Sequence, residues 1–155
     1  MADRAEEIVI GFGADETMTF RLLWAQAPQT CEAITAALPF RGEASHATHS
    51  GPGAVVFLEA ELPVPPEHVT VTPAVGELLY THYPARWRRG YLAQTSEIYW
   101  FHATGGRPTV PGLFVPAMAS VFAEPSGSSQ ELRSFCDWSA LLNREGWKPI
   151  SIEAR

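Results

Sequence analysis

The chain has 155 residues, the length of one domain, and with 46% hydrophobic and 11% aromatic residues it is not disordered. The formal net charge of −6 at pH 7 argues against nucleic acids and anionic membranes as partners, because both bind basic surfaces. Thirteen prolines and twelve glycines suit short strands joined by tight turns better than a helical bundle. We therefore predict a single domain over residues 1–155.

The N-terminal segment, residues 1–7, has no apolar signal core, and no run of residues approaches membrane-spanning length. A cytoplasmic location is the resulting expectation. The two cysteines, Cys31 and Cys136, fall in helical patterns, so we expect buried free thiols.

The first half of the chain reads as a hairpin followed by a helix and more strands. Strands over residues 7–11 and 17–24 flank a Gly-Ala-Asp-Glu turn, which is typical of a β-hairpin. Residues 27–38 combine Pro28 at the start with apolar residues at helical spacing, and they predict a short amphipathic helix. Further strands follow at 42–49, 54–60, 69–72 and 76–82.

The second half contains two loops, two strands and a longer helix. A strongly aromatic strand over residues 97–102 separates loops at 83–95 and 104–112, and another strand follows at 118–123. Ser128 and Glu131 have the spacing of a capping box, so a helix is expected from there to Gly146, before a closing strand at 149–153. The strands do not alternate with helices. The predicted fold is mainly β, a closed antiparallel β-barrel with two capping helices.

Two stretches resemble the cyclophilin family. Pro28, Thr30 and Glu32 fall on identical positions of its segment Ala/Val-Pro-Lys-Thr-x-Glu-Asn-Phe. Phe40-Arg41-Gly42 followed by His46 is similar to its Phe/Tyr-Lys-Gly-x-x-Phe-His-Arg segment. The segments Ala27–Leu38, His46–Gly51 and Pro73–Leu79 resemble those of a bacterial family of uncharacterised cyclophilin-like proteins, and this resemblance covers nearly the whole chain. The resemblance implies a cyclophilin-like β-barrel and places His46 beside the strand that carries the cyclophilin active site.

The chain departs from cyclophilins where their chemistry resides. The resemblance puts Ala47 at the position of the arginine that binds the rotating amide, and alanine has no donor to offer. The Gln-Gly-Gly-Asp segment is also missing, since this chain has Phe57-Leu-Glu-Ala. Prolyl isomerase activity is therefore disfavoured.

Five histidines, two of them in one short segment, raise the question of a metal site. Side chains alternate along a strand, so His46 and His49, three residues apart, are expected on opposite faces. No third ligand is evident nearby. We expect no metal and no cofactor.

A ligand cleft with acid–base groups is the more favoured interpretation. His82 shares a strand face with Tyr80, and Glu97 shares one with Tyr99. A pairing of Glu97 with His46 or His82 would orient an imidazole for proton transfer, although the sequence does not show that they meet. Arg86, in a loop that also carries other arginines and aromatic residues, is a candidate for holding an anion or a planar ring.

Three functions remain open from the sequence. The favoured one is a small-molecule-binding protein whose ligand is unknown. Its binding residues would be His46, His49, Tyr80, His82, Arg86, Glu97 and Tyr99. The second is an enzyme on a small metabolite with His46 and Glu97 as the acid–base pair. The third is an interaction module that forms a homodimer through the loop around Trp87.

Overall fold

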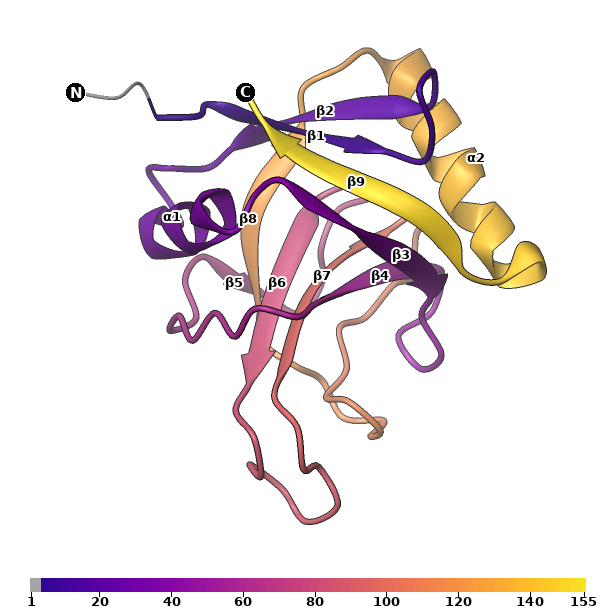
Figure 1. Cartoon of the computed structure of the whole chain (residues 1–155). Coiled ribbons are helices and arrows are strands. Elements are labelled where there is room, and N and C mark those ends of the chain that lie inside the picture. The colour runs from indigo at the N-terminus through magenta and orange to yellow at the C-terminus, as the bar shows by residue number, and fades with distance from the viewer. Residues whose placement is uncertain (1–3) are drawn as a thin grey trace.

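The computed structural model describes residues 4–155 and consists mainly of a closed barrel (Figure 1). Eight of its nine strands follow one another around the barrel in the order β2-β1-β9-β3-β4-β7-β6-β8, and β8 pairs back onto β2. All pairings are antiparallel, and β5 adds a short pairing to β8. The strands are β1 Glu7–Gly11, β2 Thr17–Leu22, β3 Phe40–His46, β4 Gly53–Leu58, β5 Val69–Thr70, β6 Leu78–Tyr83, β7 Thr95–Phe101, β8 Ala119–Pro125 and β9 Lys148–Ala154.

The prediction of a mainly β chain with a closed antiparallel barrel and two helices is confirmed. Several strands are shorter than predicted, β2 and β3 among them. β2 ends at Leu22 and β3 ends at His46, where a turn replaces the last three residues of the predicted strand. Closure of the barrel pairs the strand edges that an open sheet would expose.

The two helices lie on opposite sides of the barrel (Figure 1). Helix α1, Pro28–Ala36, packs against β8 and begins with Pro28 in its first turn. Helix α2, Ser129–Glu145, packs against β2, β3 and β4. Its N-terminus has the predicted capping box, in which Ser128 and Glu131 each bond the backbone of the other, and it ends at Gly146. Neither described helix has the length and hydropathy that crossing a membrane requires.

The inside of the barrel is filled by an apolar core. Trp100 and Phe135 pack at a ring-centroid distance of 5.2 Å, and the Trp100 indole N–H donates to Ser139 of α2 at 2.9 Å. Trp100, Phe122 and Phe135 are fully buried. Because strand side chains alternate, the neighbouring residues of β4, β6, β7 and β8 face outward.

A second buried cluster lies on that outer face. Its residues are Leu23, Val55, Leu79, Tyr99, Phe101, Ala119 and Val121. The loop from residue 102 to 118 covers part of it. Gly106 lies so close to the Phe101 ring that a Cβ there would meet ring atoms at 2.1 Å. Strand β7 is thus buried on both faces, which explains why its sequence is apolar at successive positions.

Phe114 is the most exposed large apolar residue of the covering loop, at 82%. It lies in the turn between Thr109 and Pro116, which form an isolated β-bridge with each other, and it belongs to neither buried cluster.

Candidate functional site

A cleft of about 400 Å³ lies on the outer face of the barrel. Its floor follows the strand register, since Ser45 on β3 is opposite Val55 on β4, and Val55 is opposite Tyr99 on β7. The walls come from two loops and from the connection between α2 and β9. The lining residues are Ser45, His46, Ala47, Thr48, His49, Ser50, Val55, Phe57, Glu97, Tyr99, Thr109, Pro111, Gly112 and Trp147.

The two loops that form the walls are held in place by hydrogen bonds. The Ser50 and Thr109 hydroxyls lie 2.8 Å apart, and the Arg107 N–H donates to the Ser50 carbonyl at 2.8 Å. The Tyr91 hydroxyl donates to the carbonyl of Pro111 at 2.7 Å, which joins the β6–β7 loop to the cleft wall. A site whose walls are fixed in this way is largely formed before a ligand arrives.

Glu97 is the carboxylate of the cleft. It is partly buried between Phe57 of β4 and Thr81 of β6, its two partners in the strand register. The Thr81 hydroxyl donates to Glu97 Oε1 at 3.0 Å. Burial raises the pKa of Glu97 to about 7, and the Thr81 hydrogen bond offsets only part of that rise. A carboxyl group in this environment changes its charge near neutral pH.

The imidazole of His46 makes its hydrogen bonds with groups other than Glu97. Its Nδ1 lies 2.8 Å from the Ala47 carbonyl, and its Nε2 lies 3.2 Å from Nε2 of His102, a residue just beyond β7. The carbonyl only accepts, so His46 Nδ1 carries the hydrogen and, in the neutral pair, His102 donates to His46. Burial and, secondarily, the adjacent His46 lower the pKa of His102.

The described residues contain no ion pair within 4 Å between Glu97 and any histidine. The acid–base pair of His46 and Glu97 is therefore not assembled in this structure, although both residues line the cleft.

His49 lies in the turn after β3, so strand alternation does not govern its direction. Its ring packs edge-on against Phe114 at 4.8 Å between centroids, and its Nδ1 lies 3.0 Å from the Thr48 hydroxyl. The rings of His46 and His49 thus have separate partners. Within residues 4–155, no group of three His, Cys, Asp or Glu side chains is arranged to hold a metal ion.

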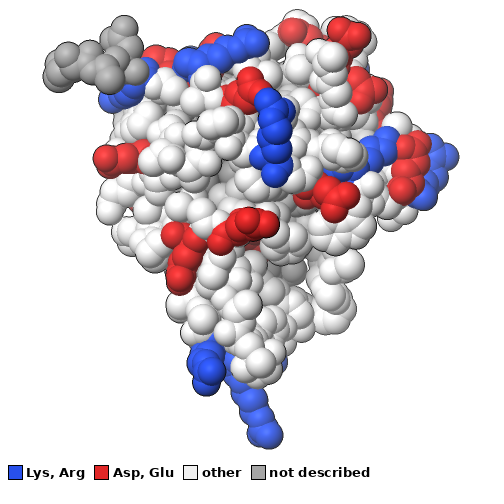
Figure 2. All heavy atoms as spheres, in the orientation of Figure 1, with Lys and Arg blue, Asp and Glu red and all other residues white. Residues whose placement is uncertain are grey.

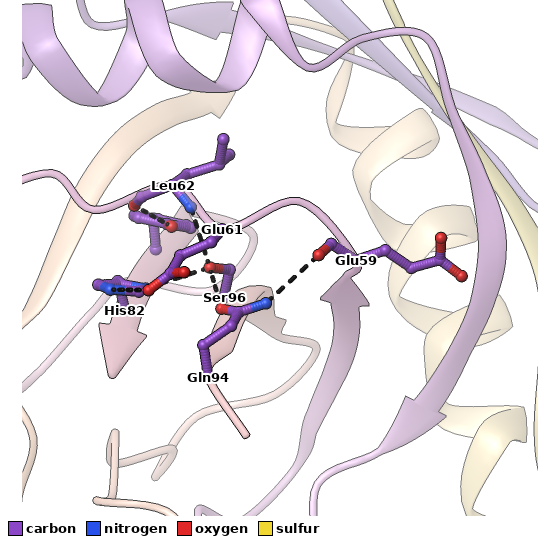
Figure 3. Close-up of polar contacts among 7 residues, drawn as sticks. Glu59, Glu61, Leu62, His82, Gln94 and Ser96 are labelled. Carbon is purple, nitrogen blue, oxygen red and sulfur yellow. Dashed lines mark hydrogen bonds and ion pairs between the residues drawn. The ribbon is translucent and has the colours of Figure 1, made fainter. Parts of the chain in front are cut away.

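Tyr80 and His82 do not line this cleft. They point to the other face of β6, where they contact the extended segment that follows β4, as Figure 3 shows for His82 and Glu61. The Tyr80 hydroxyl donates to the Leu62 carbonyl at 2.6 Å, and His82 Nε2 lies 3.6 Å from Glu61 Oε1. His82 Nδ1 lies 3.2 Å from the Ser96 hydroxyl. A smaller pocket of about 260 Å³ includes Tyr80 and His82.

Glu61, His82 and Ser96 have the residue types of a nucleophilic triad, but their arrangement is structural. Ser96 is only 1% exposed, its hydroxyl donates to Gln94 at 2.7 Å, and it accepts from the Leu62 N–H at 3.3 Å. Figure 3 shows this chain of contacts linking β7 to the segment after β4. The network attaches that proline-rich segment to the barrel.

Arg86 lies in the loop between β6 and β7, outside the cleft. Trp87 of this loop packs between Tyr83 and Tyr91, at 4.7 and 5.3 Å between ring centroids, and the Arg88 guanidinium lies 5.5 Å from the Tyr91 ring. In Figure 2 the tip of the molecule where this loop lies carries basic side chains, whereas the acidic side chains gather above it. The arginines are therefore a separate surface feature.

The family comparison assigns the chain to a group defined by sequence. The family model described as "Protein of unknown function (DUF3830)" matches residues 13–135. The chain belongs to the DUF3830 family. No curated protein matches it.

Solved structures support the fold of this DUF3830 member. A hypothetical protein from Archaeoglobus fulgidus is similar with a TM-score of 0.60 and 19% identity, over the full length of both chains. McbB, solved in complex with tryptophan, is similar with a TM-score of 0.69 and 12% identity, over 94% of this chain and 44% of that one. Likeness at such identities shows the fold alone.

Sequence analysis missed several residues of the cleft in this DUF3830 member. Ser45, Phe57 and Trp147 line it, yet none of them carries a sequence pattern that indicates a site. Trp147 is 58% exposed and follows the helix stop at Gly146. An aromatic residue directly after a helix stop is the one signal that would have drawn attention to it.

Proposed function

We propose that the protein binds a small molecule in the cleft on the outer face of the barrel, with Glu97 as its polar anchor. A concave site that combines apolar and aromatic surface with polar groups and a perturbed carboxyl group is typical of a ligand pocket. The observation that carries the proposal is the position of Glu97, a half-buried carboxyl group that faces the cleft between Phe57 and Tyr99.

The proposal excludes prolyl isomerisation. Ala47, which the resemblance to cyclophilins aligns with their arginine, lines the cleft and has no side-chain donor. A protease-coupled peptide assay is expected to show no acceleration above the uncatalysed rate. Acceleration close to that of an ordinary cyclophilin would contradict this part of the proposal.

A second candidate function is an enzyme that acts on a small metabolite. Glu97 is the observation in its favour, because a carboxyl group with a pKa of about 7 exchanges protons readily at neutral pH. In this structure Glu97 would have to act without an orienting histidine. Turnover of any ligand that binds the cleft, lost in Glu97→Gln with binding retained, would favour the enzyme over the binding protein.

A thermal-shift screen of a metabolite library tests the binding function. A ligand present at about 100 times its Kd stabilises the folded state by about 2.7 kcal/mol, which is readily measured. Phe57→Ala removes a half-exposed cleft residue and should weaken the binding of each hit.

Val69→Ala is the matched control, because Val69 on β5 is as exposed as Phe57, 46% against 47%, and does not line the cleft. Hits that respond equally to both substitutions, or a library without any hit, would overturn the proposed function.

A further inference from the structure

We propose that the cleft is selective for a protonated amine on an apolar body, with the ammonium group bound by Glu97 and the body packed against Phe57, Tyr99 and Trp147. This inference rests on the proposed binding function and names the class of ligand that the same site accepts.

The first argument is the missing counter-charge. Within residues 4–155, no Lys, Arg or His nitrogen lies within 4 Å of the Glu97 carboxylate, and no Lys or Arg lines the cleft. The histidines of the cleft have other partners, since His46 contacts Ala47 and His102, and His49 contacts Thr48. The protein thus supplies a carboxylate in a poorly solvated place and leaves its cationic partner to come from outside.

The second argument is the free oxygen. Thr81 donates to Oε1 of Glu97, and no other described side chain or backbone group donates to this carboxylate. Oε2 has no hydrogen-bond partner among residues 4–155 and keeps some accessible surface, and Glu97 lines the cleft. An ammonium group offers three donors, and its bond to a carboxylate is stronger than a bond between neutral groups.

The third argument is the apolar and aromatic surface around that oxygen. Phe57 is directly opposite Glu97 in the β4–β7 register, and Tyr99 lies two residues along the same face of β7. Trp147, which is 58% exposed, also lines the cleft. Aromatic faces attract cations and also cover apolar carbon, so they suit both parts of such a ligand.

The same features disfavour the other ligand classes. An anion would lie beside a carboxylate with no arginine or lysine to balance it, and like charges in a partly buried site repel strongly. A neutral alcohol makes a hydrogen bond to Oε2 but leaves the buried negative charge uncompensated. The expected order of affinity is therefore amine, then alcohol, then carboxylate.

Three probes of similar shape test the inference at pH 8, where Glu97 is ionised. They are 2-phenylethylamine, 2-phenylethanol and 3-phenylpropanoate, followed by NMR signals of cleft residues and by calorimetry. The amine is expected to bind about 10-fold more tightly than the alcohol, which corresponds to one charge-assisted hydrogen bond. Glu97→Gln should abolish this preference, chiefly by lowering the affinity for the amine.

Glu16→Gln is the matched control, because it removes the same charge from an exposed turn between β1 and β2. It should retain the amine preference. Equal binding of amine and alcohol by the unsubstituted protein, or a preference that survives Glu97→Gln, would overturn the inference. Library hits that depend on Phe57 but lack a basic nitrogen would also overturn it and leave the proposed function standing. The absence of any cleft ligand would remove both.

Discussion

At the scale of single residues, Glu97 is a costly choice for this position. An apolar residue would complete the outer cluster beside Phe57 and Tyr99, yet a carboxyl group is placed there with one protein donor. Residues that break the local rule for burial without structural compensation are concentrated at functional sites. The energetic cost of Glu97 is therefore a measurable sign of its role.

Glu97→Gln should stabilise the protein at alkaline pH. The folded-state pKa of Glu97 is about 7, above the value of 4.5 for an unperturbed glutamate. The folded protein therefore binds the proton more tightly than the unfolded chain, and this contribution to stability is fully present below pH 4.5. That contribution is lost as pH rises through 7. At pH 8 to 9 the ionised, buried group costs on the order of 3 kcal/mol, since each tenfold change in proton affinity corresponds to about 1.4 kcal/mol.

Urea unfolding at pH 5 and pH 8.5 measures this effect. The difference in unfolding free energy between Glu97→Gln and the wild type is expected to grow in favour of the variant with rising pH. A difference that stays constant across this range would contradict a buried, unpaired carboxyl group. Tyr83, Tyr99 and the cleft histidines face the same region and are present in both proteins.

The predictions for single residues depended on which face of a strand each side chain occupies, and the alternation of side chains along a strand predicts that face. Alternation placed Glu97 with Tyr99 and placed Tyr80 with His82, as the structure shows. Alternation does not say which face is inside the barrel or which strands are neighbours. For that reason the contact between His46, at the end of β3, and His102, just after β7, was not predicted.

At the scale of elements, helix α1 has an unusual N-terminus. Its N-cap residue is Ala27, which offers no side-chain oxygen. Glu67, which is far away in sequence, supplies the cap instead. Its carboxylate accepts from the Thr30 N–H and hydroxyl at 2.8 and 2.9 Å, and from Gln29 at 3.1 and 3.2 Å. Burial acts to raise the pKa of Glu67, but these hydrogen bonds outweigh it and the pKa is lowered.

Glu67→Gln should destabilise the protein at pH 7 by about 1 to 2 kcal/mol, the usual cost of losing a helix cap. A lowered folded-state pKa means that the stabilisation exists above the unfolded value and disappears as pH falls through the folded one. The difference between variant and wild type should thus shrink below pH 4. Chemical unfolding at pH 7 and pH 3.5 measures it.

Glu32→Gln, at an exposed position of α1 with no side-chain hydrogen bond, is the control. An equal effect of both substitutions would show that general charge, and not capping, is responsible.

The sequence predicted each helix and strand because local signals mark them, such as Pro28, the capping box and Gly146. It could not predict the cap from Glu67, since that contact depends on how the segment after β4 folds back over α1. The cleft walls were missed for the same reason. They are loops whose conformations are fixed by contacts between distant residues, such as Ser50 with Thr109.

At the scale of the whole molecule, β9 holds the barrel together. It pairs with β1 on one side and β3 on the other, so the C-terminal strand connects the N-terminal hairpin to the strands that form the cleft. Trp147, at the cleft, immediately precedes β9. Packing around β9 is thus linked to the geometry of the candidate site.

Ile152→Ala should therefore weaken the entire barrel and not only its own neighbourhood. Ile152 is fully buried and lies between Ile10 of β1 and Phe40 of β3 in the strand register, so truncation leaves a cavity and costs about 2 to 5 kcal/mol. Because the described strands form one closed hydrogen-bonded ring, the sheet and the cleft should unfold together. Far-UV circular dichroism and NMR signals of β4 and β7 are expected to shift to the same lower urea midpoint. Glu153→Ala, an exposed neighbour with only a surface ion pair to Arg41, should change stability by less than about 1 kcal/mol. Separate midpoints for the two probes in Ile152→Ala would show that the cleft floor unfolds independently of β9.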